Sequence, residues 1–367
     1  MRAIVLEQTG HPTRLEELEL DPPRAGEVLV RLEASGICHS DLHVRDGEWE
    51  RPGPIVLGHE GAGIIEAVGP GVTDRAVGQR VALSWYYPCL ACRACQSGRQ
   101  WLCESTRALD HRLPDGSSRI RRPDGQEVLA YLAIGTLAER TIVPTSAAIP
   151  IPSIVAPEVA ALIGCCVTTG VGAVLKTAEV PAGASVAVFG LGGVGLSVVM
   201  GAVVAGATRI IAIDRVPAKL DLARELGATD TIRATEPEAT IAAVHETSRG
   251  GPDFAFEAVG LPATIEQAIA VLPRGGTAVL VGLTPFGARA TFEAFPFVDG
   301  ARRLLGSNYG SAVAAIDFPR YAELHLDGRL PIERLVERRI GLGEVEDAFE
   351  QMRRGRYARQ VVTEFAA

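Results

Sequence analysis

Four cysteines stand close together in the first third of the chain, at spacings that suit a metal ion. They lie within Pro-Cys-Leu-Ala-Cys-Arg-Ala-Cys-Gln-Ser-Gly-Arg-Gln-Trp-Leu-Cys and are Cys89, Cys92, Cys95 and Cys103. Four thiolates can form a closed tetrahedral shell around zinc, and a closed shell leaves no position for a substrate. The segment is therefore interpreted as a structural zinc site. An iron–sulfur cluster is the chemical alternative, because four cysteines also bind such clusters.

A second set of potential metal ligands is spread along the chain and mixes cysteine with histidine. Cys38 lies in Gly-Ile-Cys-His-Ser-Asp, His59 in Gly-His-Glu-Gly-Ala-Gly, and Cys165 in Leu-Ile-Gly-Cys-Cys. Two thiolates and one imidazole neutralise Zn²⁺ and leave its fourth position open, which is the arrangement of a catalytic zinc. Taken alone, each residue also fits a structural interpretation, since a single cysteine is usually a small buried hydrophobe.

A glycine-rich turn between two apolar runs indicates a dinucleotide-binding unit. The first run, residues 185–189, leads into Gly190-Leu-Gly-Gly-Val-Gly195, and the second, residues 209–213, ends at Asp214. Strand, glycine turn, helix, strand and acidic residue, in this order, form the dinucleotide-binding fingerprint. Residues 181–208 carry no charge and are numerous enough for a membrane span. The glycine turn inside this stretch favours a buried strand, turn and helix instead.

Each position of this fingerprint has a physical role. Gly190 permits a tight turn, Gly192 lets the backbone approach a pyrophosphate, and Gly195 lets the helix pack against the strand. The helix N-terminus offers unpaired N–H groups to the phosphates. Asp214 is placed to accept hydrogen bonds from the adenosine ribose and to repel a 2′-phosphate, which favours NAD over NADP. Arg215, the next residue, is able to weaken that preference.

Composition and charge are those of an ordinary globular protein. The 367 residues suffice for two domains, and the formal net charge is −8. This acidic balance argues against nucleic acid or an anionic membrane as a general partner. The N-terminus lacks the long apolar core of a signal peptide, so we expect a cytoplasmic location. In that compartment the seven cysteines are better interpreted as metal ligands or thiols than as disulfides.

The elements that must position these residues follow two patterns. Residues 1 to about 160 contain short β-like runs separated by glycine and proline, which predict a mainly antiparallel β domain. Residues from about 166 to 308 alternate strand-like and helical segments, a pattern that builds a doubly wound parallel sheet covered by helices. The predicted fold class is therefore α/β.

The combined motifs resemble the zinc-dependent medium-chain alcohol dehydrogenases, in the long form that includes a structural-zinc lobe. The resemblance covers essentially the whole length. It rests on Gly58-His-Glu-Gly-Ala-Gly63 with Gly69 and Val72, the four-cysteine segment, Leu-Ile-Gly-Cys165, the glycine turn with Asp214, and the C-terminal Arg359-Gln-Val-Val. Several motifs in the correct order are more specific than any one of them. There is also some similarity to the thiol-adduct formaldehyde dehydrogenases.

The resemblance implies a fold, cofactors and a reaction. The fold is a GroES-like catalytic domain over residues 1–165 and 309–367, with the structural-zinc lobe at about 86–106, and a Rossmann NAD-binding domain over residues 166–308. The cofactors are NAD and two zinc ions per chain, one catalytic and one structural. The reaction interconverts primary alcohols and aldehydes by hydride transfer to and from the nicotinamide.

The resemblance also implies roles for individual residues around the catalytic zinc. Cys38, His59 and Cys165 are its ligands, whereas Cys166 falls where the family commonly has glycine and is a bystander. Glu60 lies behind the metal as an occasional ligand, and Asp41 orients His59. Ser40 and His43 form a proton relay. The positions implied to contact the cofactor are His39, Gly190, Gly192, Gly193, Val194, Gly195, Asp214, Arg215, Lys219, Val281 and Arg359.

Three aromatic residues and one arginine bear on substrate specificity. Trp49, Trp85 and Tyr131 match positions that line the substrate cleft in relatives, which suggests aromatic or longer aliphatic alcohols. Simple core packing by three aromatic residues is the alternative. Arg107 matches a carboxylate-binding position of thiol-dependent formaldehyde dehydrogenases, which act on adducts of glutathione or mycothiol. Against that second specificity, His43 and Trp49 stand where the glutathione-type enzymes have tyrosine and an acidic residue.

A function of another class is a non-catalytic zinc- and nucleotide-binding protein. The presence of Cys38, Ser40, His59 and Cys165 together argues against it. The expected partners are a small alcohol or aldehyde, with neither nucleic acid nor membrane. The long polar segment from Glu104 to Leu129 accompanies dimers in relatives, so a homodimer is expected, with a homotetramer as the alternative.

Overall fold

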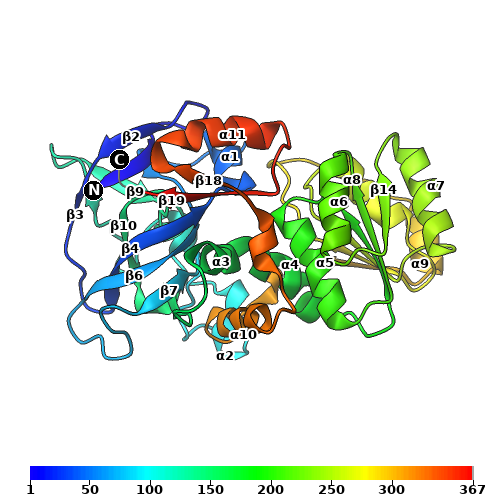
Figure 1. Cartoon of the computed structure of the whole chain (residues 1–367), viewed down its shortest axis with the longest axis horizontal. Helices are drawn as coiled ribbons and strands as arrows, with labels where there is room; N and C mark the ends of the chain where they lie inside the picture. The colour runs from blue at the N-terminus through cyan, green and yellow to red at the C-terminus, as the bar shows by residue number, and fades with distance from the viewer. Residues whose placement is uncertain (366–367) are drawn as a thin grey trace. The chain divides into compact units, whose positions relative to one another are not determined.

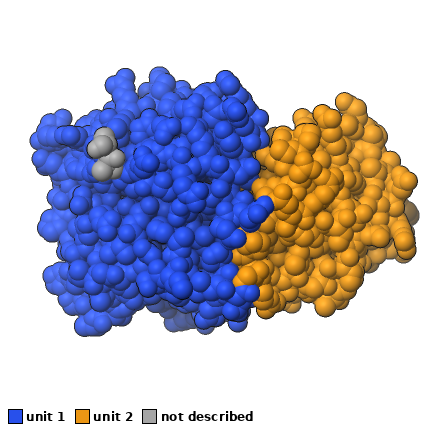
Figure 2. Space-filling model, viewed as in Figure 1, with its two compact units in different colours: residues 1–165, 313–327, 332–367 blue, residues 166–312, 328–331 orange. Residues whose placement is uncertain are grey.

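The computed structural model describes residues 1–365 and divides into two compact units, coloured separately in Figure 2. The first unit comprises Met1–Cys165, Val313–Asp327 and Ile332–Ala367. The second comprises Cys166–Ala312 and Gly328–Pro331. The chain therefore passes into the second unit directly after Cys165, at the residue that the sequence analysis assigned as the last zinc ligand.

The first unit is built mainly from strands (Figure 1). Its strands are β1 (Arg2–Leu6), β2 (Arg14–Glu17), β3 (Glu19–Leu20), β4 (Glu27–Gly36), β5 (Ile55–Val56), β6 (Glu60–Val68), β7 (Arg80–Leu83), β8 (Ile120–Arg121), β9 (Glu127–Ala130), β10 (Arg140–Pro144), β11 (Ala148–Pro150), β18 (Val336–Gly341) and β19 (Arg359–Glu364). Its helices are α1 (His39–Arg45), α2 (Arg93–Gln96), α3 (Pro157–Leu162), α10 (Ala314–Leu326) and α11 (Val345–Arg353). One sheet has the order β2-β1-β5-β9-β8-β3, and the other has the order β11-β7-β6-β4-β19-β18 with β10 also paired to β4.

β4 is the strand that organises this unit. Its sequence, Glu-Val-Leu-Val-Arg-Leu-Glu-Ala-Ser-Gly, alternates buried and half-buried positions over most of its length, so one face packs into the core. Antiparallel pairing with β6 sets Gly36 opposite Glu60, and antiparallel pairing with β19 sets Gly36 opposite Val361. This register brings three segments together at one end of the sheet: the residues after β4, those before β6, and the start of β19.

The second unit contains one parallel sheet of six strands in the order β14-β13-β12-β15-β16-β17. These are β12 (Ser185–Phe189), β13 (Arg209–Asp214), β14 (Asp230–Arg233), β15 (Phe254–Glu257), β16 (Thr277–Leu280) and β17 (Arg303–Gly306). The helices are α4 (Thr168–Gly172), α5 (Gly193–Ala205), α6 (Pro217–Glu225), α7 (Pro237–Ser248), α8 (Pro262–Ala270) and α9 (Ala294–Asp299). The strand order reverses direction at β12, which is the topology of the Rossmann fold. The predicted α/β class is confirmed.

The second crossing between the units lies later than the sequence analysis placed it. Residues 309–312 belong to the second unit, and so do Gly328–Pro331. The reason is close packing of the turn Tyr309–Ser311 on α4. A Cβ atom added to Gly172 would lie 2.4 Å from the carbonyl oxygen of Gly310. The boundary after residue 308 was therefore four residues early, because short turn sequences carry no periodic signal of the unit they pack against.

The longest apolar helical stretch is not the one that the sequence analysis considered as a membrane span. Residues 181–208 contain β12, the glycine turn and α5, as expected. Pro157–Thr177 is long and apolar enough by composition to cross a membrane, and 83% of its most apolar window is buried inside the structure. Such burial is typical of a core helix.

Candidate metal centre and active site

Cys38, His59, Glu60 and Cys165 meet in one buried cluster, where one ligand atom of each lies within 4.8 Å of the others. Each of them is less than a tenth exposed. Cys38 is the N-cap of α1, His59 and Glu60 stand at the start of β6, and Cys165 lies in a π-helical turn after α3. Single π-helical turns occur frequently at functional sites. Cys166, although buried, is not a member of this cluster.

The donor chemistry of this cluster fits zinc. Two sulfur atoms and an imidazole form a set that zinc binds in tetrahedral sites with one position left open. A hydrogen bond from the thiol of Cys165 lowers the pKa of Cys38 well below its usual range. Burial opposes the charged form of His59, but Asp41 and Cys38 outweigh it and raise the pKa of His59 well above its usual range. The site therefore favours negative charge on the sulfur of Cys38, whereas Cys38 and burial raise the pKa of Cys165.

Asp41 lies directly behind His59. Its Oδ2 is 3.2 Å from Nδ1 of His59, with the geometry of an ion pair rather than of an aligned hydrogen bond. Its Oδ1 accepts a hydrogen bond of 2.9 Å from the backbone N–H of Gly58. Asp41 is fully buried in the first turn of α1. A carboxylate at Nδ1 leaves Nε2 as the histidine atom that faces the two thiols.

Glu60 and Arg359 form a buried ion pair at the same cluster. Nη2 of Arg359 is 2.9 Å from Oε1 of Glu60, and its Nη1 donates to the carbonyl oxygen of Ile37 over 2.9 Å. Burial raises the pKa of Glu60 to about 7 although Arg359 opposes the shift. Oε2 of Glu60 is buried without a hydrogen-bond partner among residues 1–365. The space around it requires glycine at position 36, where a Cβ atom would lie 2.1 Å away.

The contacts of Arg359 in the structure differ from the one expected from the sequence. Its expected contact was with the cofactor pyrophosphate, yet the guanidinium is 5% exposed and holds Glu60 and the backbone before Cys38. The pairing of β19 with β4 causes this position. Contact with a pyrophosphate stays a prediction.

α1 carries the two residues predicted to form a proton relay. Ser40 and His43 are three residues apart and thus neighbours on one helix face. Nδ1 of His43 is 2.5 Å from Oε2 of Glu48. The ring of Trp49 stacks on His43 with 4.6 Å between centroids and 29° between planes. His39, on the same helix, is exposed, and its ring is 5.2 Å from that of His43.

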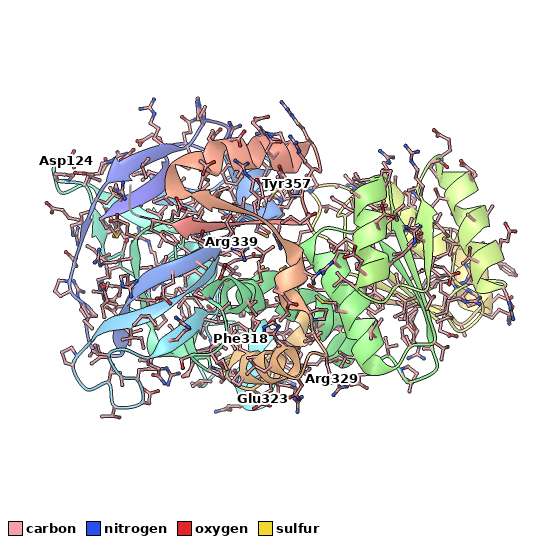
Figure 3. All side chains as sticks on the ribbon, in the orientation of Figure 1. Asp124, Phe318, Glu323, Arg329, Arg339 and Tyr357 are labelled. Atoms are coloured by element: carbon pink, nitrogen blue, oxygen red, sulfur yellow. The ribbon has the colours of Figure 1, made fainter. Side chains whose placement is uncertain are left out.

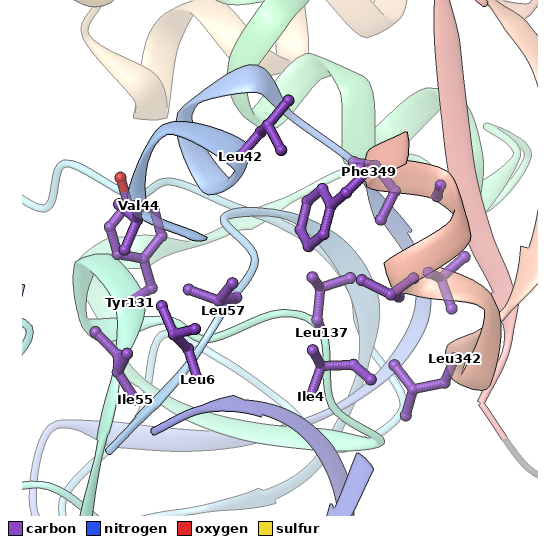
Figure 4. Packing of buried hydrophobic residues seen from close by; sticks show 14 of the residues in the cluster. Ile4, Leu6, Leu42, Val44, Ile55, Leu57, Tyr131, Leu137, Leu342 and Phe349 are labelled. Carbon is purple, nitrogen blue, oxygen red and sulfur yellow. The ribbon is translucent and has the colours of Figure 1, made fainter. Parts of the chain in front are cut away.

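Of the three predicted pocket residues, Trp49 and Tyr131 are buried and Trp85 is half-buried. Trp49 and Tyr131 belong to a buried hydrophobic cluster with Leu42 and Val44 of α1, and Trp85 packs against it. Figure 4 shows Tyr131, Leu42 and Val44 in this cluster. The edge of Tyr131 meets the ring of His59 at 5.6 Å and 77°. Tyr131 thus packs in the core and also contacts His59, whereas its place in a substrate cleft stays a prediction.

The four-cysteine segment forms a second cluster, with its ligand atoms also within 4.8 Å of one another. The sulfur atoms of Cys89 and Cys95, and those of Cys92 and Cys103, are 4.0 Å apart, about twice a disulfide bond length. Backbone N–H groups of Ala91 and Cys92 donate to the sulfur of Cys89 over 3.5 and 3.3 Å. These donors lower the pKa of Cys89 to about 6. Four thiols, one of them readily ionised, fit a closed zinc site.

The glycine turn of the second unit has the geometry of a nucleotide loop. Gly190 has a φ of +89°, and a Cβ atom there would lie 2.4 Å from the side chain of Val259. A Cβ atom on Gly195 would lie 1.8 Å from the carbonyl oxygen of Gly190, so the helix approaches the strand end closely. A Cβ atom on Gly192, the N-cap of α5, meets nothing within 4 Å. Gly193 and Val194 begin α5.

Asp214 is the last residue of β13, and its carboxylate accepts a hydrogen bond from the glycine turn. Its Oδ2 accepts a 2.8 Å hydrogen bond from the N–H of Leu191, and its Oδ1 accepts one of 2.9 Å from Val216. Arg215 is exposed, and Lys219 lies half-buried in the first turn of α6. Val281 follows β16 at the same carboxyl edge of the sheet. Parallel sheets bind ligands outside this edge.

Comparison with known proteins agrees with this geometry. Residues 24–153 match the model of the alcohol dehydrogenase GroES-like domain, and residues 193–326 match that of the zinc-binding dehydrogenase. An S-(hydroxymethyl)glutathione dehydrogenase from Synechocystis is 38% identical over 98% of this chain and 99% of its own length. The chain belongs to the zinc-type medium-chain alcohol dehydrogenase family. It is an enzyme of the zinc-dependent NAD oxidoreductases, as the motifs implied.

Other members of this alcohol dehydrogenase family differ in the substrates that their names state. The NDMA-dependent alcohol dehydrogenase of Amycolatopsis methanolica is 37% identical over 98% of both chains. The crystal structure of benzyl alcohol dehydrogenase from Acinetobacter calcoaceticus has a TM-score of 0.90 and 32% identity, and 99% of each chain is covered. The names of the relatives thus include both substrate classes that the sequence analysis considered.

Three features of this dehydrogenase were missed by the sequence analysis. Glu48 contacts His43, Arg359 contacts Glu60, and Nδ1 of His111 accepts a 3.1 Å hydrogen bond from the N–H of Leu132, beside Tyr131. Glu48 could have been suspected, since it follows His43 by five residues. The contacts Arg359–Glu60 and His111–Leu132 join segments that are distant in the sequence, so no local pattern predicts them.

Proposed function

We propose that this dehydrogenase interconverts primary alcohols, aromatic or longer aliphatic, with the corresponding aldehydes, using NAD. The observation that carries the proposal is the buried Cys38, His59 and Cys165 cluster bordered by the ring of Tyr131. An apolar aromatic neighbour favours an apolar substituent on the reacting carbon.

The chain's own residues suit the binding of a catalytic zinc. Cys38, His59 and Cys165 would hold it, with Glu60 as the occasional fourth ligand and Asp41 fixing the orientation of His59. When bound, the zinc supplies a Lewis acid that stabilises negative charge on the substrate oxygen. Arg359 balances the charge of Glu60 on the other side of the cluster.

Proton transfer is assigned to Ser40 and His43. A serine hydroxyl can accept and donate a proton at once, and a histidine can pass the proton to water. Both are at least partly accessible on α1, whereas the cluster beside them is buried. The proton therefore has a route that avoids the buried ligands.

NAD is assigned to the glycine turn and the carboxyl edge of the parallel sheet. Asp214 favours an unphosphorylated ribose, and the open side of Gly192 with the N-terminus of α5 suits the pyrophosphate. His39, Arg215, Lys219, Val281 and Arg359 are the further contacts that we propose. A comparison of NAD and NADP as oxidants, which should favour NAD at least tenfold, tests Asp214.

Thiol-adduct formaldehyde oxidation is the second candidate function. The relatives named S-(hydroxymethyl)glutathione dehydrogenase favour it. Against it, Arg107 lies 3.6 Å from Asp110 on a half-exposed surface, and Trp49, which stacks on His43, stands where the glutathione-type enzymes have an acidic residue. Turnover on benzyl alcohol, hexanol and formaldehyde with glutathione or mycothiol separates the two. We expect benzyl alcohol or hexanol to react without thiol, and strict thiol dependence would overturn this choice.

Two zinc ions per chain and a homodimer complete the proposal, with a cytoplasmic location consistent with seven free thiols. β17 ends the parallel sheet, and three of its four residues are exposed. Phe286, Phe295 and Val298, before β17 in the chain, are also strongly exposed. An open strand edge with apolar neighbours is typical of a subunit contact. Metal analysis and light scattering test both points; one zinc per chain or a monomer would contradict them.

A further inference from the structure

The turn that follows α1 folds back over His43. The N–H of Asp46 donates to the carbonyl of Leu42 over 2.8 Å, and Gly47 continues with a φ of +83°. The carbonyl oxygen of His43 then accepts two hydrogen bonds, of 2.9 Å from Glu48 N–H and 3.2 Å from Trp49 N–H. Glycine is needed at position 47, since the left-handed backbone disfavours any Cβ. Two hydrogen bonds thus tie the backbone of this turn to His43, whereas Asp46 and Gly47 donate to Leu42 and Val44.

The two side chains of the turn contact two different parts of the His43 ring. Oε2 of Glu48 is 2.5 Å from Nδ1, at the ring edge, and Trp49 stacks on the face. Trp49 is buried and holds its own position through core packing. A hydrogen bond at the edge and a stacked face together leave the imidazole little rotational freedom.

We propose that Glu48 is a positioning residue of the proton relay, an inference that rests on the proposed alcohol oxidation. Its carboxylate accepts the Nδ1 proton of His43 and so selects the tautomer in which Nε2 carries the free lone pair. During alcohol oxidation the substrate proton passes to Ser40, the Ser40 hydroxyl proton passes to Nε2 of His43, and Nε2 then releases that proton to water while the Nδ1 proton stays hydrogen-bonded to Glu48. No proton leaves Glu48 in this sequence.

Orientation, rather than charge, is the main contribution of Glu48. Its side chain is 45% exposed, so water screens its electrostatic effect on the ring. An uncharged hydrogen-bond acceptor at position 48 should therefore retain most of the effect of Glu48 on the orientation of the ring. That expectation distinguishes a positioning residue from a surface ion pair, whose loss would scarcely change the chemistry.

The test compares single-turnover NADH formation from benzyl alcohol, or from whichever alcohol the wild-type enzyme oxidises best, in zinc-loaded full-length variants. Glu48→Ala should lower the rate about tenfold, in the range found for residues that orient a reacting group from behind, with KM within about twofold. Glu48→Gln should recover most of the loss, because its amide oxygen still accepts the Nδ1 proton. Glu50→Ala, which removes an equal charge from an exposed position two residues away, is the matched control and should match the wild type.

A double-variant cycle separates positioning from structural support. If Glu48 acts through His43, Glu48→Ala adds no further loss in a His43→Gln background. A tenfold loss that persists in that background, or a Glu48→Ala rate equal to the wild type, would overturn the inference. Failure of the wild-type enzyme to oxidise any alcohol without thiol would instead overturn the proposed function. Thermal unfolding of every variant shows whether a lost rate reflects an unfolded fraction.

Discussion

The four-cysteine lobe and the buried Cys38, His59, Glu60 and Cys165 cluster hold similar donor atoms in different surroundings, although Cys95 and Cys103 of the lobe are also buried. In the lobe, Cys89 is exposed, and backbone N–H groups of its own turn point at its sulfur. In the buried cluster, side chains from other strands and helices stand behind the ligands: Asp41 behind His59, and Arg359 behind Glu60.

The contrast indicates two ways in which these clusters would hold a metal. The backbone N–H groups of one short segment can position the four thiols of a closed site. A closed site binds no substrate, so no ligand position has to be kept open. An open site must keep an unused position while charges are buried around it, so each ligand requires its own partner. The side chains behind the ligands therefore distinguish the buried cluster from the lobe.

The largest expected effect is a loss of turnover that follows substitution in the buried cluster but not in the lobe. Cys165→Ser should lower turnover by roughly 10³-fold or more, since the metal contributes several kcal/mol to the reaction. Cys92→Ser, in the lobe, should leave the turnover of folded molecules nearly unchanged and lower the melting temperature instead. Zinc content, turnover and thermal unfolding measured on both variants check this. A folded Cys92→Ser protein without activity would contradict the proposal that the lobe is structural and the buried cluster catalytic.

The buried ion pair between Glu60 and Arg359 should contribute to the stability of the folded protein. Arg359→Met leaves Glu60 buried without its cation and should cost about 3 kcal/mol of unfolding free energy at pH 8. The cost should shrink toward pH 6, because the carboxyl of Glu60, with its pKa already raised to about 7, then takes up a proton. Denaturant unfolding at both pH values is the measurement.

Arg339 offers a matched control in the same unit (Figure 3). Its Nε is 2.7 Å from Glu158, but its side chain is 58% exposed. Arg339→Met should therefore cost no more than about 1 kcal/mol. Equal losses for the two arginine variants would mean that the buried pair gives no special support to the cluster.

The smallest expected effect is a difference in thiol reactivity after zinc is removed with a chelator. Iodoacetamide should modify Cys89 at least about tenfold faster than Cys165, because the thiolate is the nucleophile. The pKa of Cys89 is lowered to about 6 by the N–H groups of Ala91 and Cys92, so its rate should rise with pH through 6 and then level off. Cys38 and burial raise the pKa of Cys165 well above its usual range.

Peptide mapping by mass spectrometry over pH 5–8 follows each thiol separately. Slow modification of Cys165 throughout this range is the expected result. Equal rates at Cys89 and Cys165 would indicate that the buried cluster opens without metal, and the contrast between the two sites would then depend on zinc itself.

Much of this molecule could be predicted because its signals are local. The lobe cysteines lie within one turn-rich segment, and the glycine turn with Asp214 follows from strand and helix patterns over some thirty residues. The contact of Arg359 with Glu60, and the return of Tyr309–Ser311 to α4, join segments that are far apart along the chain. Such contacts depend on strand register and packing, which no residue spacing records.

The sequence by itself determined the α/β class, the glycine turn and the four-cysteine lobe, because each is specified by neighbouring residues. It also carried enough family motifs to name the candidate ligands Cys38, His59 and Cys165. Only the tertiary structure decided that these ligands meet, because the pairing of β4 with β6 places Cys38 and His59 at one end of a sheet. α3 packs against both strands and brings Cys165, in the turn after it, to the same place. The pairing of β4 with β19 buries Arg359 against Glu60, whereas the tight turn after α1 brings Glu48 to His43.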